Sequence, residues 1–137
     1  MTAKALSVEH SHSKFHESTI SKTQRILGYI LSILFSIQIL MAGVMKLVKA
    51  PPIVENMNAV VNWGDKILLL GVLELVLLVL YWVPQTTKLG FYLLCSFMGG
   101  VIVAEVVAGK VPVVGIATAI MLFAGTIMRN PSLLKNN

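Results

Sequence analysis

The sequence consists of long apolar stretches separated by short polar or proline-containing segments. Four such stretches occupy residues 26–48, 67–83, 89–108 and 111–128. The first contains 23 residues and would rise about 34 Å as an α-helix, enough to cross the roughly 30 Å hydrocarbon core of a bilayer. The pattern therefore predicts four transmembrane helices.

Prolines and a glycine mark the ends of these helices. Pro51 and Pro52 end the first helix, Pro84 ends the second, and Gly109 and Pro112 suit the turn between the third and the fourth. Helices joined by such short connections pack as antiparallel neighbours. The expected fold is an all-α membrane protein, an antiparallel four-transmembrane-helix bundle.

The segment between the first two helices has a helical pattern of its own. Its apolar residues recur at nearly helical spacing, at Ile53, Val54, Met57, Val60, Val61 and Trp63. The pattern predicts a short amphipathic helix at the membrane interface, with Trp63 at the level of the lipid headgroups. A structured loop without a helix is the alternative.

Polar segments flank the predicted membrane domain. We expect a disordered cytoplasmic tail over residues 1–25, a transmembrane domain over residues 26–131 and a C-terminal tail over residues 132–137. The first tail contains three histidines, His10, His12 and His16. No cysteine accompanies them and their spacing matches no common zinc site, so we expect no metal site.

The composition supports exposure to lipid. Of the 137 residues, 56% are hydrophobic and 12% are charged, and a soluble domain of this size could not bury so much apolar surface. The net charge of +5 is spread over the ends of the apolar stretches and forms no basic stripe. We therefore expect no nucleic-acid partner.

Basic residues are divided unevenly between the two sides of the predicted membrane. The tails and the loop after the second helix hold Lys4, Lys14, Lys22, Arg25, Lys88, Arg129 and Lys135. The other side holds Lys49, Lys66 and Lys110, with Lys46 close to it. Lysine and arginine concentrate on the cytoplasmic side of membrane proteins. We therefore expect a multi-pass protein of the cell inner (plasma) membrane with both termini in the cytoplasm.

Three ionisable side chains lie within the apolar stretches: Lys46, Glu74 and Glu105. An ionised group in the membrane is costly and normally faces the protein interior with a partner. With both termini inside, all three fall in the outer half of the bilayer, Glu74 roughly 10 Å and Glu105 roughly 5 Å below the outer surface. We expect an ion pair between Lys46 and Glu74, with Glu105 in the same polar cluster.

Small residues point to the faces that meet inside the protein. Gly43 lies one turn before Lys46, and Gly71 lies one turn before Glu74, so backbones can approach closely there. In the third stretch, Ser96 and Gly100 lie four residues apart, on one face of a helix. Gln38 is expected to make an interhelical hydrogen bond rather than to bind a ligand.

The polar cluster has three possible roles. It can be a purely structural ion pair that fixes helix register, a pocket for a polar or redox-active ligand, or part of a proton or ion path. No histidine lies in any apolar stretch, so we expect no haem ligation. The single cysteine, Cys95, is read as a buried apolar side chain. No sequence motif indicates a catalytic residue, and we therefore expect that the protein is not a stand-alone enzyme.

Several short motifs occur in order over about residues 25–131: Ala42-Gly43-Val44-Met45-Lys46-Leu47, Pro51-Pro52, Gly71-Val72-Leu73-Glu74-Leu75, Gly99-Gly100 and Arg129-Asn130-Pro131. Together they resemble the motifs of the DoxX-like family of small four-helix bacterial membrane proteins. The resemblance implies a four-helix membrane fold. It also implies an association with thiosulfate–quinone oxidoreduction and with membrane complexes for redox or sulfur stress.

The leading hypothesis is an accessory or anchoring subunit of a membrane complex, related to redox or sulfur chemistry as the resemblance implies, with a polar pocket inside the membrane. Quinone is the cofactor that this hypothesis allows. The expected partners are the lipid bilayer and either another membrane protein or a second copy of the chain. The alternative is a small proton-coupled transporter or permease that uses Glu74 as its protonatable group.

Overall fold

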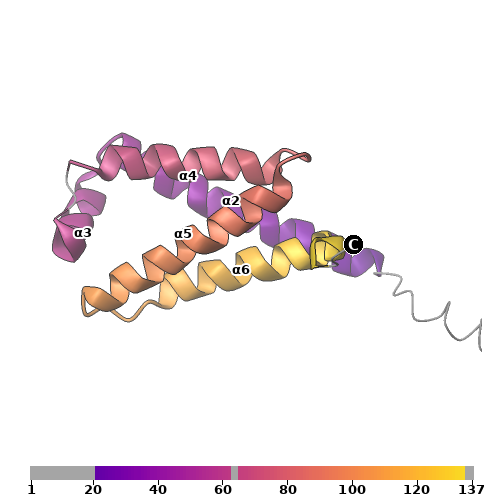
Figure 1. Ribbon diagram of the computed structural model, residues 1–137. Helices are drawn as coiled ribbons and strands as arrows, with labels where there is room; N and C mark the ends of the chain where they lie inside the picture. Colours follow the sequence, from indigo (N-terminus) through magenta and orange to yellow (C-terminus); the bar gives the residue numbers. More distant parts are fainter. Residues whose placement is uncertain (1–20, 63–64, 135–137) are drawn as a thin grey trace, which may run out of the picture.

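The computed structural model describes residues 21–62 and 65–134, and this part of the chain is helical without any strand. Its elements are α2 (Lys22–Leu47), α3 (Pro51–Val61), α4 (Ile67–Trp82), α5 (Thr87–Val107), α6 (Val113–Arg129) and a final 3₁₀ turn, η1 (Pro131–Leu134) (Figure 1). The all-α fold is confirmed. Trp63 and most of the predicted N-terminal tail lie outside the described residues.

The helix ends follow local capping as well as hydropathy. α2 begins at Lys22, four residues before the apolar stretch, because the Ser21 side chain accepts a hydrogen bond from the Gln24 backbone N–H at 3.4 Å. A helix of 11 residues, α3, follows Pro51 and Pro52 at its first two positions. A helix thus forms between the first two apolar stretches, where a loop was the alternative.

The four long helices form a closed ring of contacts. α2 packs against α4 and α6, and α5 packs against the same two helices (Figure 1). The contact between α2 and α4 is close at two glycines, since a side-chain carbon at Gly71 would lie 2.9 Å from the carbonyl oxygen of Gly43. This close approach was expected from the sequence, and it brings the turns that carry Lys46 and Glu74 together.

One expected small-residue contact is absent from α5. Ser96 is exposed, and a side-chain carbon at Gly100 would meet no atom within 4 Å among the described residues. Gly100 nevertheless faces inward as expected, because it lines a cavity between the helices rather than a close helix contact. A serine hydroxyl can hydrogen-bond to its own helix backbone, so Ser96 does not need a neighbouring helix.

The ring is closed at the end where the α4–α5 turn and the C-terminal turn lie. Tyr81 is completely buried, and its hydroxyl lies 3.0 Å from the Ser32 Oγ and 2.8 Å from the Thr126 Oγ1. The Arg129 guanidinium lies 4.8 Å from the centre of the Tyr81 ring and 4.9 Å from that of Trp82. An aromatic residue at the end of an apolar stretch is typical of an interfacial anchor, yet Tyr81 is the polar centre of the packed end.

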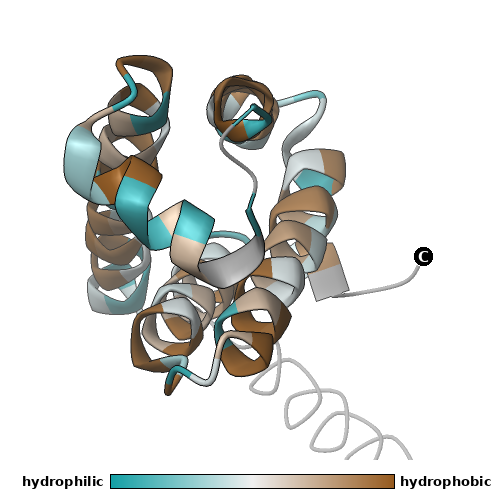
Figure 2. Cartoon of the chain, turned by 90° about the vertical axis from the view of Figure 1, so that its left-hand side faces the viewer, coloured by the Kyte–Doolittle hydropathy of each residue, from teal (hydrophilic) through white to brown (hydrophobic). Residues whose placement is uncertain are grey.

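The outer surface of the ring is apolar, as Figure 2 shows by the brown turns along the long helices. α2 and α5 are long and apolar enough to cross a membrane, yet only 28% and 22% of their most apolar windows are buried inside the protein. The core helix of a soluble protein would be mostly buried. The apolar side chains therefore face outward, where a bilayer would cover them. α4 and α6 are apolar but shorter, with 16 and 17 residues.

Candidate functional site

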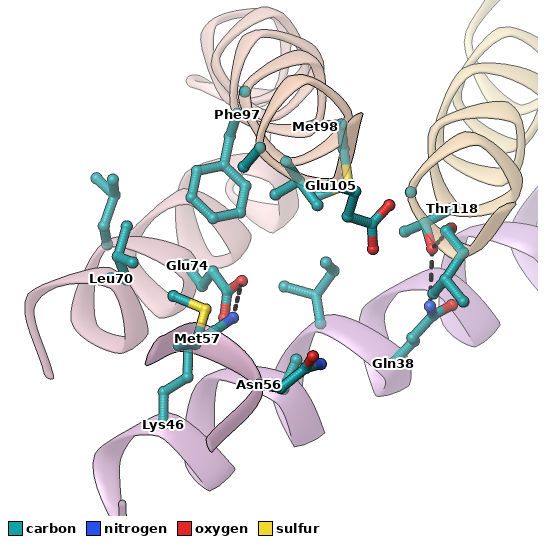
Figure 3. A pocket seen from close by; sticks show the side chains of 18 of the residues that line it. Gln38, Lys46, Asn56, Met57, Leu70, Glu74, Phe97, Met98, Glu105 and Thr118 are labelled. Atoms are coloured by element: carbon teal, nitrogen blue, oxygen red, sulfur yellow. Dashed lines mark hydrogen bonds and ion pairs between the residues drawn. The ribbon is translucent and has the colours of Figure 1, made fainter. Parts of the chain in front are cut away.

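A cavity of about 400 Å³ lies inside the ring, toward the end where the helices diverge and α3 lies across them. All four long helices and α3 contribute to its wall. The lining side chains from these helices include Gln38, Lys46, Met57, Leu70, Glu74, Phe97, Met98, Glu105 and Thr118 (Figure 3). Lys110 of the α5–α6 turn also lines the cavity. The three ionisable residues predicted from the sequence thus share one cavity.

Lys46 and Glu74 form an ion pair in the wall of this cavity. The Lys46 ammonium donates to the Oε1 of Glu74, with exposed side-chain fractions of 13% and 3%. Lys46 stands in the last turn of α2 and Glu74 in the middle of α4, where Gly43 and Gly71 let the two helices approach. The expected pairing is present, and each charge offsets part of the other's desolvation cost.

Glu105 lies on another wall of the cavity and does not join the ion pair (Figure 3). Its Oε2 is buried without a hydrogen-bond partner among the described residues. The atom sits over Gly115 of α6, where an added side-chain carbon would lie 3.0 Å away. The glycine therefore leaves room for the carboxylate. The predicted three-membered cluster is an ion pair plus a separate carboxylate.

Gln38 makes the interhelical hydrogen bond that its position in α2 predicted. Its Nε2 donates to the Thr118 Oγ1 of α6 at 2.7 Å, and that hydroxyl donates to the Val114 carbonyl, also at 2.7 Å. The pair satisfies both polar groups at the edge of the cavity. It also ties α2 to α6 next to the site.

α3 covers part of the cavity through contacts that sequence analysis missed. Met57 is half-buried and lines the cavity, and Asn56 accepts a hydrogen bond from the Lys110 ammonium in the α5–α6 turn. The apolar spacing of the segment predicted the helix and Met57 on its apolar face. Nothing in the sequence links Asn56 to Lys110.

Two acceptor atoms stand out in this site. The Oε2 of Glu74 and the Oε2 of Glu105 are buried and have no hydrogen-bond partner within residues 21–62 and 65–134. The remaining wall is mostly apolar, from side chains such as Leu70, Phe97 and Met98. Apolar cavities with a few convergent polar groups are typical ligand sites. This cavity is suited to holding a small molecule and orienting its polar group.

The model of the DoxX-like family matches residues 30–128 of the sequence. The chain belongs to the DoxX-like family. The matched range contains every residue that lines the cavity, from Gln38 to Thr118. Neither a curated protein nor a solved structure matches the sequence. With its apolar exterior and two helices long enough to cross a bilayer, this DoxX-like chain is a membrane protein.

The unpartnered atoms of the cavity do not themselves pair with an oxidised quinone, the cofactor that the DoxX-like resemblance allows. Quinone carbonyl oxygens accept hydrogen bonds, and the buried atoms without partners among the described residues, on Glu74 and Glu105, are also acceptors. Lys46 and Gln38 each donate to a protein oxygen, which does not use all of their N–H groups. The two buried acceptors favour a ligand that donates, and no redox step is derived from the site.

Proposed function

We propose that this DoxX-like protein crosses the cell inner membrane four times, with both termini in the cytoplasm. In this proposal it acts as an accessory subunit of a membrane complex, and its intramembrane cavity holds a small ligand. The observation that carries the proposal is the cavity itself, walled by five helices and lined by a buried ion pair and by two carboxylate oxygens that have no hydrogen-bond partner in the described part of the chain. Such groups bind and orient a ligand.

Packing supports the four crossings. As helices, α4 and α6 contain 16 and 17 residues and would rise about 24 and 26 Å, somewhat less than the roughly 30 Å of an average hydrocarbon core. Each packs against both α2 and α5, the two helices that are long enough to cross the bilayer. α4 and α6 should therefore lie at the same depth in the membrane as these neighbours. The mismatch costs only fractions of a kcal/mol per Å and is met by local thinning of the bilayer.

The distribution of basic residues supports the orientation. Within the described residues, Lys22, Arg25, Lys88 and Arg129 gather at the end of the ring with the α4–α5 turn, and Lys49, Lys66 and Lys110 lie at the α3 end. The tails add further lysines to the first group. The positive-inside rule then puts the α3 end, and with it the cavity, on the outer side.

Cysteine labelling distinguishes four crossings from two. Cys95 is the single cysteine, so variants of a Cys95→Ala chain carrying Gln85→Cys or Val111→Cys, both at exposed turns, report one loop each. We expect a membrane-impermeant maleimide to label Val111→Cys in intact cells and Gln85→Cys only after permeabilisation. If α2 and α5 alone crossed, the two results would be exchanged.

The closed end of the ring favours a binding role for the protein over a transport role. The buried Tyr81 hydroxyl is hydrogen-bonded there to the buried Ser32 and Thr126, and the Arg129 guanidinium lies over the Tyr81 ring. The cavity lies toward the opposite end. This asymmetry supports a pocket with one opening, which holds a ligand for a partner protein, more than a path across the membrane.

The accessory role is tested by filling the cavity. Gly100 lines it and Gly99 does not, and neither glycine has an atom within 4 Å of an added side-chain carbon in the described part of the chain. After cross-linking in intact membranes and native electrophoresis, we expect the chain in an assembly with a second membrane protein. Gly100→Phe should reduce that assembly, and Gly99→Phe should not.

The opposite result has a clear meaning. If the native chain runs free of any partner and proteoliposomes carry a proton-coupled flux that Glu74→Gln removes, the accessory role is wrong. The transporter hypothesis would then take its place. Thermal unfolding of both phenylalanine variants verifies that each is folded before either comparison is made.

A further inference from the structure

We propose that the cavity binds a small lipophilic ammonium ion, a protonated amine with an apolar body, whose N–H groups donate to Glu74 Oε2 and Glu105 Oε2. The inference rests on the proposed function, in which the cavity is a ligand pocket, and it names the ligand class. It follows from three features of the described wall: free acceptors, a charge imbalance and an apolar lining.

The free acceptors define the hydrogen bonding. Glu74 is 2% exposed and uses one carboxylate oxygen for Lys46, which leaves Oε2 buried and unpartnered beside the cavity. Glu105 presents a second buried, unpartnered oxygen from α5. Buried acceptors without partners are unfavourable, and an ionised acceptor is more so. A ligand with several N–H donors supplies the hydrogen bonds that these oxygens lack.

The charges around the cavity define the charge of the ligand. Four charged side chains line it: Lys46 from α2, Glu74 from α4, Glu105 from α5 and Lys110 from the α5–α6 turn. α3 and α6 contribute the neutral Asn56 and Thr118. Lys46 compensates Glu74, and the exposed Lys110 donates to Asn56. Among the described residues, the Glu105 carboxylate is left without a cation, so a single positive charge completes the site.

The rest of the lining defines the body of the ligand. Met57, Leu70, Phe97 and Met98 surround the carboxylates with apolar surface (Figure 3). The volume of about 400 Å³ lies in the lower part of the range of about 300–1,000 Å³ that is typical of small-molecule sites. A polyamine would bring several charges into an apolar space with one free carboxylate. A monoamine attached to an alkyl or aryl group matches the wall.

The test compares a protonated amine with its neutral isostere on the purified full-length protein in lipid nanodiscs. The probes are 4-phenylbutylamine and 4-phenylbutan-1-ol, measured by isothermal titration calorimetry. We expect the amine to bind roughly tenfold to a hundredfold more tightly, the effect of a charge-assisted hydrogen bond to a carboxylate. Because the native protein is used for both probes, a folding defect cannot produce the difference.

Variants locate the binding. Glu105→Gln removes the uncompensated charge and should reduce amine affinity toward that of the alcohol, and Gly100→Phe should abolish binding of both. Gly99→Phe is the matched control that retains it. Equal affinity for amine and alcohol, or tighter binding of a short-chain quinone that survives Glu105→Gln, would overturn the inference. Either result leaves the accessory role intact, since that role is measured by assembly in membranes.

Discussion

Lys46→Met is expected to lower the free energy of unfolding by about 3–5 kcal/mol, because it leaves the Glu74 carboxylate buried without its cation. Glu74 is 2% exposed and accepts from the Lys46 ammonium, and its second oxygen is already unpartnered. Methionine replaces the unbranched apolar stem of the lysine and lacks only its ammonium group, so most of the packing in the last turn of α2 is preserved. The measurement is SDS titration in mixed micelles followed by circular dichroism.

Substitution of the two members of the ion pair should lower the free energy of unfolding by different amounts. Glu74→Gln leaves a charged Lys46, whose side chain is 13% exposed near the end of α2 and can extend its ammonium toward the headgroups. We therefore expect a smaller loss than for Lys46→Met. The double variant Lys46→Met/Glu74→Gln should also be more stable than Lys46→Met alone. A loss below about 1 kcal/mol for Lys46→Met would show a pair that behaves like a surface salt bridge.

The charged part of the site could be predicted from sequence because the membrane makes charge informative. An ionised side chain in an apolar stretch must face a partner, so Lys46 and Glu74 could be paired from depth alone. Gly43 and Gly71 added the close approach of α2 and α4. These four positions are placed together in the structure as the spacing indicated.

The apolar part of the site could not be predicted in this way. Lipid on one side of a helix and the cavity on the other favour the same residue types, so Phe97 and Met98 have no distinguishing pattern in α5. Tyr81 presents a related difficulty. An aromatic residue near a helix end fits an interfacial anchor, and only the three-dimensional arrangement brings Ser32 and Thr126 to its hydroxyl.

Gly90→Ala is expected to destabilise the protein by about 2–3 kcal/mol, toward the upper part of the usual range for overpacking. Gly90 is buried in the first turn of α5, directly against the backbone of α4. An added methyl group would lie 2.6 Å from the Leu80 carbonyl carbon and 2.6 Å from the Tyr81 Cα. These are backbone atoms that cannot rotate away, so α5 would have to move.

The same substitution at Gly100 separates this steric effect from helix propensity. Gly100 lies in the middle of α5, where an added carbon meets nothing within 4 Å among the described residues. Alanine is a better helix former than glycine by up to about 1 kcal/mol, so Gly100→Ala should be neutral or stabilising in the same SDS titration. If Gly90→Ala also proved neutral, α4 and α5 could not pack as closely as described.

Because Tyr81 follows Leu80 in that contact, we further expect Gly90→Ala to disturb the closed end of the ring before it disturbs the cavity. Hydrogen exchange should then rise first at Tyr81 and only later at Glu74.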